Sequence, residues 1–252
     1  MDYGWGNSYY STLLSSFVSS KYSYKGSNFC YFCYFFFWGY TGLISLGHAA
    51  YFGIGSYTVG ILTQHYSIDS FWIIAPLAVF MSMLTAAIFG IIALRMRGMY
   101  FLMITFALGE LLYSIAVEWY SLTGGYYGLT GIPRPNLSLP GFRWNNTSFY
   151  YFILLFFVIC FYILNKFVHS PFGLTLKGIR ENESRMQIMG YNTWLHKYIA
   201  FIVSGAFAGI AGMLFAYHNR LITPAHFGIV TSTSVMLMVI LGGVGTLYGP
   251  VI

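Results

Sequence analysis

The chain has 252 residues, of which 58% are hydrophobic, 21% aromatic and only 7% charged, and its formal net charge is +6. This composition leaves too little polar surface for a water-soluble globular domain, so it indicates an integral membrane protein in contact with a lipid bilayer. The basic residues stand between apolar stretches and do not line one soluble face, which argues against nucleic acid as a partner.

The first part of the chain, residues 1–28, is rich in Tyr and Ser. It lacks the basic start, apolar middle and small-residue cleavage site of a signal peptide, so we expect an irregular lead-in. Cys30 and Cys33 have CxxC spacing, but a metal site would need a second pair of ligands and a redox motif would need a soluble α/β context. We therefore expect no metal site, and we expect Cys30, Cys33 and Cys160 to be buried as small apolar residues.

Most of the chain consists of long stretches without Asp, Glu, Lys or Arg. Each reaches the roughly 20 residues that an α-helix needs to cross about 30 Å of hydrocarbon. The first stretch is long enough for two spans with a break near residues 39–47. The sequence therefore predicts an all-α, polytopic transmembrane bundle of about six or seven helices within residues 29–252. The stretches are 26–68, 70–94, 144–165, 198–219 and 221–252, together with 98–117, which only Glu110 interrupts.

The basic residues between the stretches are distributed unequally. If the turn at 95–97 is cytoplasmic, alternation of the spans puts seven Lys and Arg residues inside and three outside, in agreement with the positive-inside rule. Residues 119–148 then form the main external loop, and residues 169–197 form a cytoplasmic loop. The inside residues are Arg95, Arg97, Lys166, Lys177, Arg180, Arg185 and Lys197, and the outside residues are Arg134, Arg143 and Arg220.

Three polar residues within the predicted spans are candidates for a translocation path. Glu110 lies near the middle of its span, where a carboxylate costs on the order of 2.5–3.5 kcal/mol, so it should face the bundle interior or a cavity. Ser114, one turn later, is placed to share a hydrogen bond with it. Either this pair lines the path, or Glu110 is a protonated or paired structural acid. His48 has the same two interpretations, the structural one being a neutral imidazole that bonds across a helix break.

Two glycine-rich segments have a structural interpretation. Residues 242–249 contain neither GxGxxG nor GxxxxGK[ST], so they do not predict a phosphate-binding loop. Residues 204–212 carry small side chains at positions i and i+4, which predicts a face for close helix packing.

Residues 170–197 hold six of the eighteen charged side chains and lie between two long apolar stretches. Ser170 before Pro171 predicts a helix start, and Gly190 followed by Asn192 predicts a helix stop. The helix is either a solvated loop helix or a surface that receives force from a soluble partner. We expect apolar contacts from Leu176, Ile179, Ile188 and Met189 and exposed charges from Lys177, Arg180, Glu181, Glu183 and Arg185.

Five segments follow one another along the chain: GLISLGHAAYFGIGSYT at 42–58, RMRGMYF at 95–101, LTGG at 122–125 with GLTGIP at 128–133, GIRENE at 178–183 continuing to Gly190, and LGGVGTLYGP at 241–250. In this order they resemble the permease subunits of ABC importers for branched-chain amino acids. They cover about residues 40–252. Residues 1–38 do not resemble the family's opening helices, and the chain stops before the family's last helix, so we expect a fragment or an altered reading frame.

The resemblance implies a transport subunit that is not an enzyme and holds no cofactor, with ATP and Mg²⁺ bound by a partner ATPase. The implied partners are two ATP-binding subunits, a second homologous permease and a periplasmic substrate-binding protein, and the implied location is the bacterial cytoplasmic (inner) membrane. By the same resemblance, the charged segment is the loop that docks on the ATPase. The residues assigned to this coupling are Gly178, Arg180, Glu181, Asn182, Glu183 and Gly190.

Two other functions are compatible with the sequence. An importer of urea or short amides shares the architecture, although residues 128–133 resemble the amino-acid branch. A proton-coupled secondary carrier would use Glu110 and His48 as a proton relay and no ATPase. Such carriers are expected to contain inverted repeats, and we see none in this sequence.

Overall fold

The computed structural model describes residues 39, 41–43, 45–96, 98–135 and 146–242. The predictions for the lead-in 1–28, for Cys30 and Cys33, for Arg97 and Arg143, and for most of the glycine-rich segment 242–249 lie outside these residues. Cys160 is described, and it is buried as predicted.

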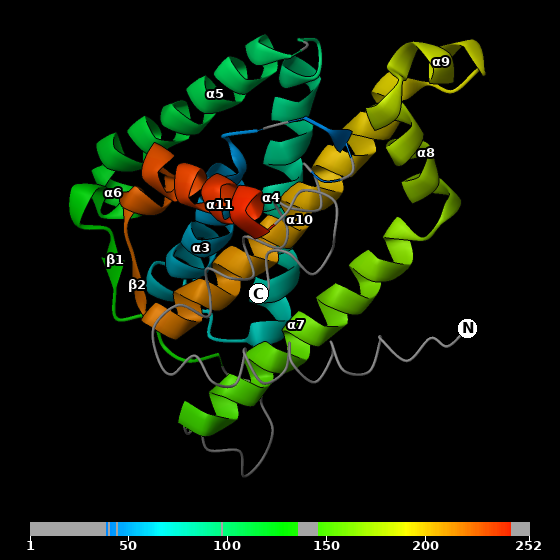
Figure 1. Cartoon of the computed structure of the whole chain (residues 1–252). Coiled ribbons are helices and arrows are strands. Elements are labelled where there is room, and N and C mark those ends of the chain that lie inside the picture. Colours follow the sequence, from blue (N-terminus) through cyan, green and yellow to red (C-terminus); the bar gives the residue numbers. More distant parts are fainter. Residues whose placement is uncertain (1–38, 40, 44, 97, 136–145, 243–252) are drawn as a thin grey trace.

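Helices make up almost all the regular structure of the described residues (Figure 1). Beside them stand two very short strands, β1 (Leu129–Thr130) and β2 (Leu221–Ile222), which pair antiparallel. The predicted all-α class is therefore confirmed. The helices are α3 (His48–Gln64), α4 (Phe71–Ala93), α5 (Met99–Glu118), α6 (Tyr120–Thr123), η1 (Gly125–Tyr127), α7 (Asn146–Val168), α8 (Pro171–Glu181), α9 (Glu183–Ile188), α10 (Thr193–Asn219), η2 (Pro224–Phe227) and α11 (Ile229–Gly242).

Within the described residues, four helices are long and apolar enough to cross a membrane: α4, α5, Tyr151–Val168 of α7, and α10. Large apolar side chains such as Trp72 and Phe80 of α4 and Met103 of α5 are exposed. Such surfaces are stable in lipid or against another subunit, but not in water. The chain is thus a polytopic membrane protein. The predicted total of about six or seven spans includes residues outside the described part.

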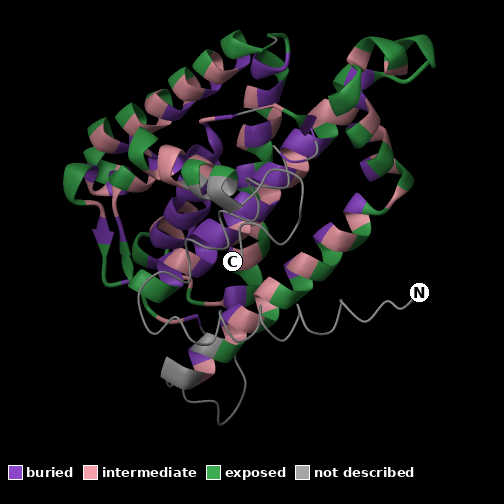
Figure 2. Ribbon diagram, viewed as in Figure 1, coloured by how far each residue is buried: buried purple, intermediate pink, exposed green. Residues whose placement is uncertain are grey.

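Helix α10 is at the centre of the bundle. In its apolar window 61% of the residues are buried, compared with 22–28% in the other three spanning helices, and the buried residues concentrate around it (Figure 2). A Cβ atom on Gly212 would lie 2.0 Å from the backbone oxygen of Phe52, and one on Gly55 would lie 2.3 Å from that of Gly209. The predicted small-residue packing face within 204–212 is therefore confirmed, and it brings α10 against α3.

The predicted break before α3 is present. Between Gly42 and Gly47 the described residues are not helical, and Ser45 and Gly47 are buried. Hydroxyl groups supply partners for the backbone here: the amide of Leu46 donates to Thr105 Oγ1 of α5 at 3.2 Å, and the amide of Gly47 donates to Ser45 Oγ at 3.3 Å. Because backbone polar groups cannot stay unpaired at membrane depth, these bonds allow α3 to begin inside the bundle.

Residues 119–135, the described first part of the predicted 119–148 loop, are folded. They form α6, η1 and β1, and Leu129 and Thr130 pair with Ile222 and Leu221 of the connection between α10 and α11. Gly128 has φ of +72°, and a Cβ on it would lie 1.9 Å from the backbone oxygen of Ile222. Only glycine fits this contact, because it tolerates both the left-handed conformation and the close approach.

Candidate functional site

The charged segment forms two helices, α8 and α9, and not the single helix predicted from Ser170 to Gly190. Its start is confirmed, since Ser170 Oγ accepts a hydrogen bond from the amide of Gly173 at 3.4 Å. Asn182, however, is extended with φ of −155°, and its Oδ1 accepts from the amide of Arg185 at 3.0 Å. The prediction was wrong because an Asn side chain can end one helix by capping the next. Gly190, with φ of +89°, makes the turn from α9 into α10.

This segment lies at the same end of the bundle as the α4–α5 connection, which carries Arg95. The β1–β2 pair lies at the opposite end, where α10 finishes (Figure 1). Lys177 and Arg185 are therefore near the end that carries Arg95, and Arg220 is at the end that carries the β1–β2 pair. Such an unequal distribution is typical of membrane proteins with the basic end in the cytoplasm, and the orientation itself stays a prediction.

The four apolar residues of the segment divide into two pairs. Leu176 and Ile179 of α8 are buried, with 0% and 3% of their surfaces exposed. Ile188 at the end of α9 is 87% exposed, and Met189 beside it is 66% exposed. The first pair fixes α8 on the bundle. The second pair, which we call the α9 tip, is an apolar surface that is exposed in the described chain.

The charged residues of the segment also form two groups, one exposed and one paired within the chain. Lys177, Glu181 and Arg185 are exposed, as predicted. Glu183 is only half-exposed and forms an ion pair of 2.8 Å with Lys197, so its prediction as a freely exposed charge was wrong. The sequence does not reveal this pair because Lys197 belongs to the first turns of α10, across the Gly190 turn.

Arg180 is exposed overall, but it reaches back into the chain. Its Nη1 donates a hydrogen bond to the backbone oxygen of Gly39. Its aliphatic stem covers Gly42, where an added Cβ would lie 3.0 Å from the Arg180 Cγ. The side chain thus joins α8 to the segment that leads into α3.

Gly178 has a local packing role. A Cβ atom on this residue would lie 2.9 Å from the sulfur of Met186 in α9. A larger residue at position 178 would require the flexible side chain of Met186 to move aside, so the glycine leaves room for α9 beside α8.

His48 lies at the first residue of α3, where the break ends. Its Nε2 is 2.9 Å from Ser204 Oγ of α10, and only 2% of the residue surface is exposed. The rings of Tyr51 and Phe201 meet it edge-on, with centroids at 5.8 and 6.0 Å. The imidazole thus joins α3 to α10, and its part in a translocation path stays a prediction.

Glu110 and Ser114 are not brought together. Glu110 is half-buried at one edge of the inward face of α5, whereas Ser114 is exposed. No hydrogen bond joins the two residues, and no described residue forms an ion pair with Glu110. Among the described residues there is also no group of three or more His, Cys, Asp and Glu side chains that could hold a metal ion.

We expect the Glu110→Gln variant to be expressed and assembled normally and to transport at the unchanged rate, because the substitution keeps shape and removes a charge that has no described partner. Transport and membrane content of the variant should be measured together. A transport rate that falls at least tenfold, with normal membrane content, would instead place Glu110 in the translocation path.

Comparison with known proteins agrees with these features. The family described as "Branched-chain amino acid transport system / permease component" matches residues 33–252. The high-affinity branched-chain amino acid transport system permease protein LivM of Salmonella typhimurium is 30% identical over 236 residues, which are 85% of this chain and 55% of that protein. The LivM protein of Escherichia coli matches with the same identity and coverage. No solved structure matches.

A more distant match is the probable LivM protein of Methanocaldococcus jannaschii. It is 25% identical over 175 residues, which are 69% of this chain and 50% of that protein. The chain thus spans about half the length of the curated relatives that it matches. Because the family match extends over residues 33–252, the chain belongs to the family of permease components of branched-chain amino acid transport systems.

Proposed function

We propose that the chain is a membrane permease subunit of an ATP-driven importer for branched-chain amino acids. The observation that carries this proposal is the α8–α9 segment, which is anchored on the bundle by buried Leu176 and Ile179 and yet leaves the α9 tip exposed. A purely solvated loop has no need of two adjacent exposed apolar side chains, whereas a docking surface for a soluble protein does. Membership of the family supports branched-chain amino acids as the substrate class.

In this proposal the chain provides the path and its partners supply the energy. A cytoplasmic ATPase dimer binds ATP and Mg²⁺ and closes. The α9 tip follows this movement, and the bundle opens alternately to the two sides of the bacterial inner membrane. A second homologous permease completes the path, and a periplasmic binding protein delivers the amino acid. The chain itself is not an enzyme.

The proposal predicts ATP-dependent uptake of labelled leucine into proteoliposomes that contain this chain, its partner permease, the two ATPase subunits and the binding protein. Uptake of urea or a short amide by the same complex, without leucine uptake, would support the alternative substrate class. Uptake that continues after ATP depletion but stops when the proton gradient is removed would contradict the ATP-driven mechanism and support a secondary carrier.

The docking surface can be tested in the same complex by replacing both Ile188 and Met189 with Glu. We expect leucine uptake to fall by about tenfold or more, because each of the few central residues that dominate a protein interface contributes about 2 kcal/mol or more. The ATPase should also be lost from the purified complex. Ile188→Leu is the matched control, since it keeps the apolar surface and should transport normally. Normal uptake by the double variant would show that the ATPase docks elsewhere.

A further inference from the structure

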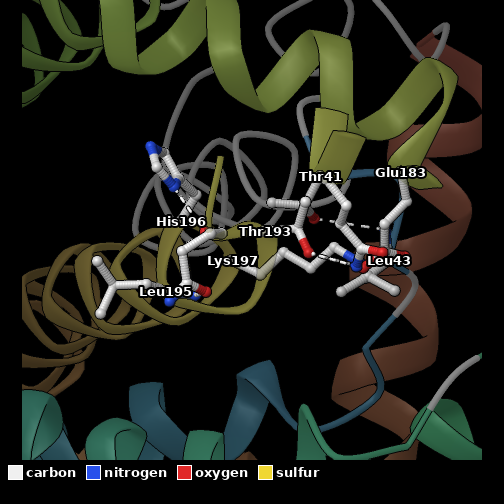
Figure 3. Close-up of polar contacts among 9 residues, drawn as sticks. Thr41, Leu43, Glu183, Thr193, Leu195, His196 and Lys197 are labelled. Atoms are coloured by element: carbon white, nitrogen blue, oxygen red, sulfur yellow. Dashed lines mark hydrogen bonds and ion pairs between the residues drawn. The ribbon is translucent and has the colours of Figure 1, made fainter. Parts of the chain in front are cut away.

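Four side chains at the junction of α9 and α10 form a connected polar cluster, which we call the α9–α10 clamp: Glu183, Gln187, Thr193 and Lys197. Glu183 Oε1 lies 2.8 Å from Lys197 Nζ. Thr193 Oγ1 donates to the same carboxylate oxygen at 3.2 Å and accepts from Gln187 Nε2 at 3.0 Å. Figure 3 shows the Glu183 side chain directed toward Thr193 and Lys197 of α10.

The clamp joins both turns of α9 to the start of α10. Glu183 is the first residue of α9 and Gln187 belongs to its last turn, and both contact the buried Thr193. The Lys197 side chain is 13% exposed and that of Glu183 is 28% exposed. A pair that is this far removed from water is less screened than a surface salt bridge, and loss of one partner leaves the other charge poorly compensated. Rotation of α9 relative to α10 would break these contacts.

The charges of the clamp are directed into the chain. Glu183 is neutralised by Lys197 and accepts a hydrogen bond from Thr193, so it has little charge to offer a partner protein. By contrast, Glu181 and Arg185 are exposed on either side of it. A charged residue of this segment can therefore serve the transporter in two ways, by contacting the ATPase or by holding the segment in place.

We propose that Glu183 and Lys197 are positioning residues, which make α9 move together with α10 and do not themselves contact the ATPase. This inference rests on the proposed function. Helix α10 is the most buried of the spanning helices and packs on α3 through Gly212 and Gly209. A displacement received at the α9 tip thus reaches the centre of the bundle through the clamp.

A charge exchange tests this proposal. In the reconstituted complex, Glu183→Lys and Lys197→Glu should each lower leucine uptake per ATP hydrolysed by about tenfold, the effect typical of directly coupled residues. The double variant, which restores the ion pair in reverse, should recover uptake to within about threefold of the unchanged complex. Glu181→Lys is the matched control. This variant makes the same charge change two residues away from Glu183. Adding Lys197→Glu to it should not restore leucine uptake per ATP hydrolysed.

Three results would overturn the proposal: unchanged uptake per ATP in both single variants, a double variant as poor as the worse single variant, or rescue of Glu181→Lys by Lys197→Glu. The second result would place Glu183 at the ATPase interface. If the single variants with reversed charge do not assemble, two milder variants can be compared. One is Glu183→Gln alone, and the other combines Glu183→Gln with Lys197→Met. The neutral pair should then transport better than Glu183→Gln alone, and equal or poorer transport would contradict the clamp.

A structural readout separates this proposal from the proposed function. Spin labels at Ser184 of α9 and Ile199 of α10 report the distance between the two helices in the purified chain, without any transport. We expect one narrow distance distribution in the unchanged chain, a broader one after Glu183→Lys, and a narrow one again in the double variant. Equal widths in all three would contradict the clamp even if leucine uptake is observed. The expected pattern without leucine uptake would contradict only the proposed function.

Discussion

Replacement of Gly212 by alanine is expected to prevent normal packing of α3 against α10. The added Cβ would lie 2.0 Å from the backbone oxygen of Phe52 and 3.0 Å from the amide nitrogen of Ser56. Backbone atoms cannot move aside as a flexible side chain does, so the two helices have to separate. Overpacking of a well-packed core costs about 1–3 kcal/mol and sometimes more. The cost of a clash with backbone atoms between α3 and α10 should be at the upper end of this range.

We therefore expect the Gly212→Ala chain to be recovered in much lower yield and to aggregate in detergent, as measured by size-exclusion chromatography after solubilisation. Gly109→Ala in α5 is the matched control. The nearest atom to a Cβ at that position is at 3.8 Å, an ordinary contact. Because Ala stabilises the interior of a helix by about 1 kcal/mol relative to Gly, this variant should be at least as stable as the unchanged chain. Equal behaviour of the two variants would contradict the close packing of α3 and α10.

Replacement of His48 by alanine is expected to lower the free energy of unfolding by about 2–4 kcal/mol, because it opens a cavity in the core and removes a buried hydrogen bond. The imidazole is packed against Tyr51 and Phe201 and is 2.9 Å from Ser204 Oγ. For a chain of this size, such a loss should lower the midpoint of thermal unfolding in detergent by roughly 5 °C or more.

Ser204→Ala provides the comparison. It removes only the hydrogen bond and should cost about 1 kcal/mol, and its effect should be smaller when His48 is already alanine. Non-additive losses of stability would establish the contact between α3 and α10. A His48→Ala chain with unchanged stability and abolished uptake would contradict the structural role and place the imidazole in the translocation path.

Much of this fold follows from sequence because its causes are local or depend on hydropathy alone. Long uncharged stretches have one stable form in lipid, the helix, so the class and the positions of α4, α5 and α10 could be predicted. The helix start at Ser170 and the break before His48 could also be predicted, since caps and glycine-rich breaks act within a few residues. Gly209 and Gly212 were recognisable as packing residues because their spacing places them on one helix face.

The pairing of polar residues was decided only by the tertiary structure. Glu181, Glu183 and Arg180 are neighbours in sequence, yet one is exposed, one is paired with Lys197, and one reaches Gly39, which is 141 residues away. Glu110 and Ser114 have the spacing of a contact but do not form one. A charge is satisfied by whichever group the folded backbone brings near it, and the Gly190 turn and the close packing of α3 on α10 determine which groups those are. The sequence by itself therefore determined where the helices and the charged segment lie, whereas the tertiary structure decided which charges of that segment are paired and which are exposed.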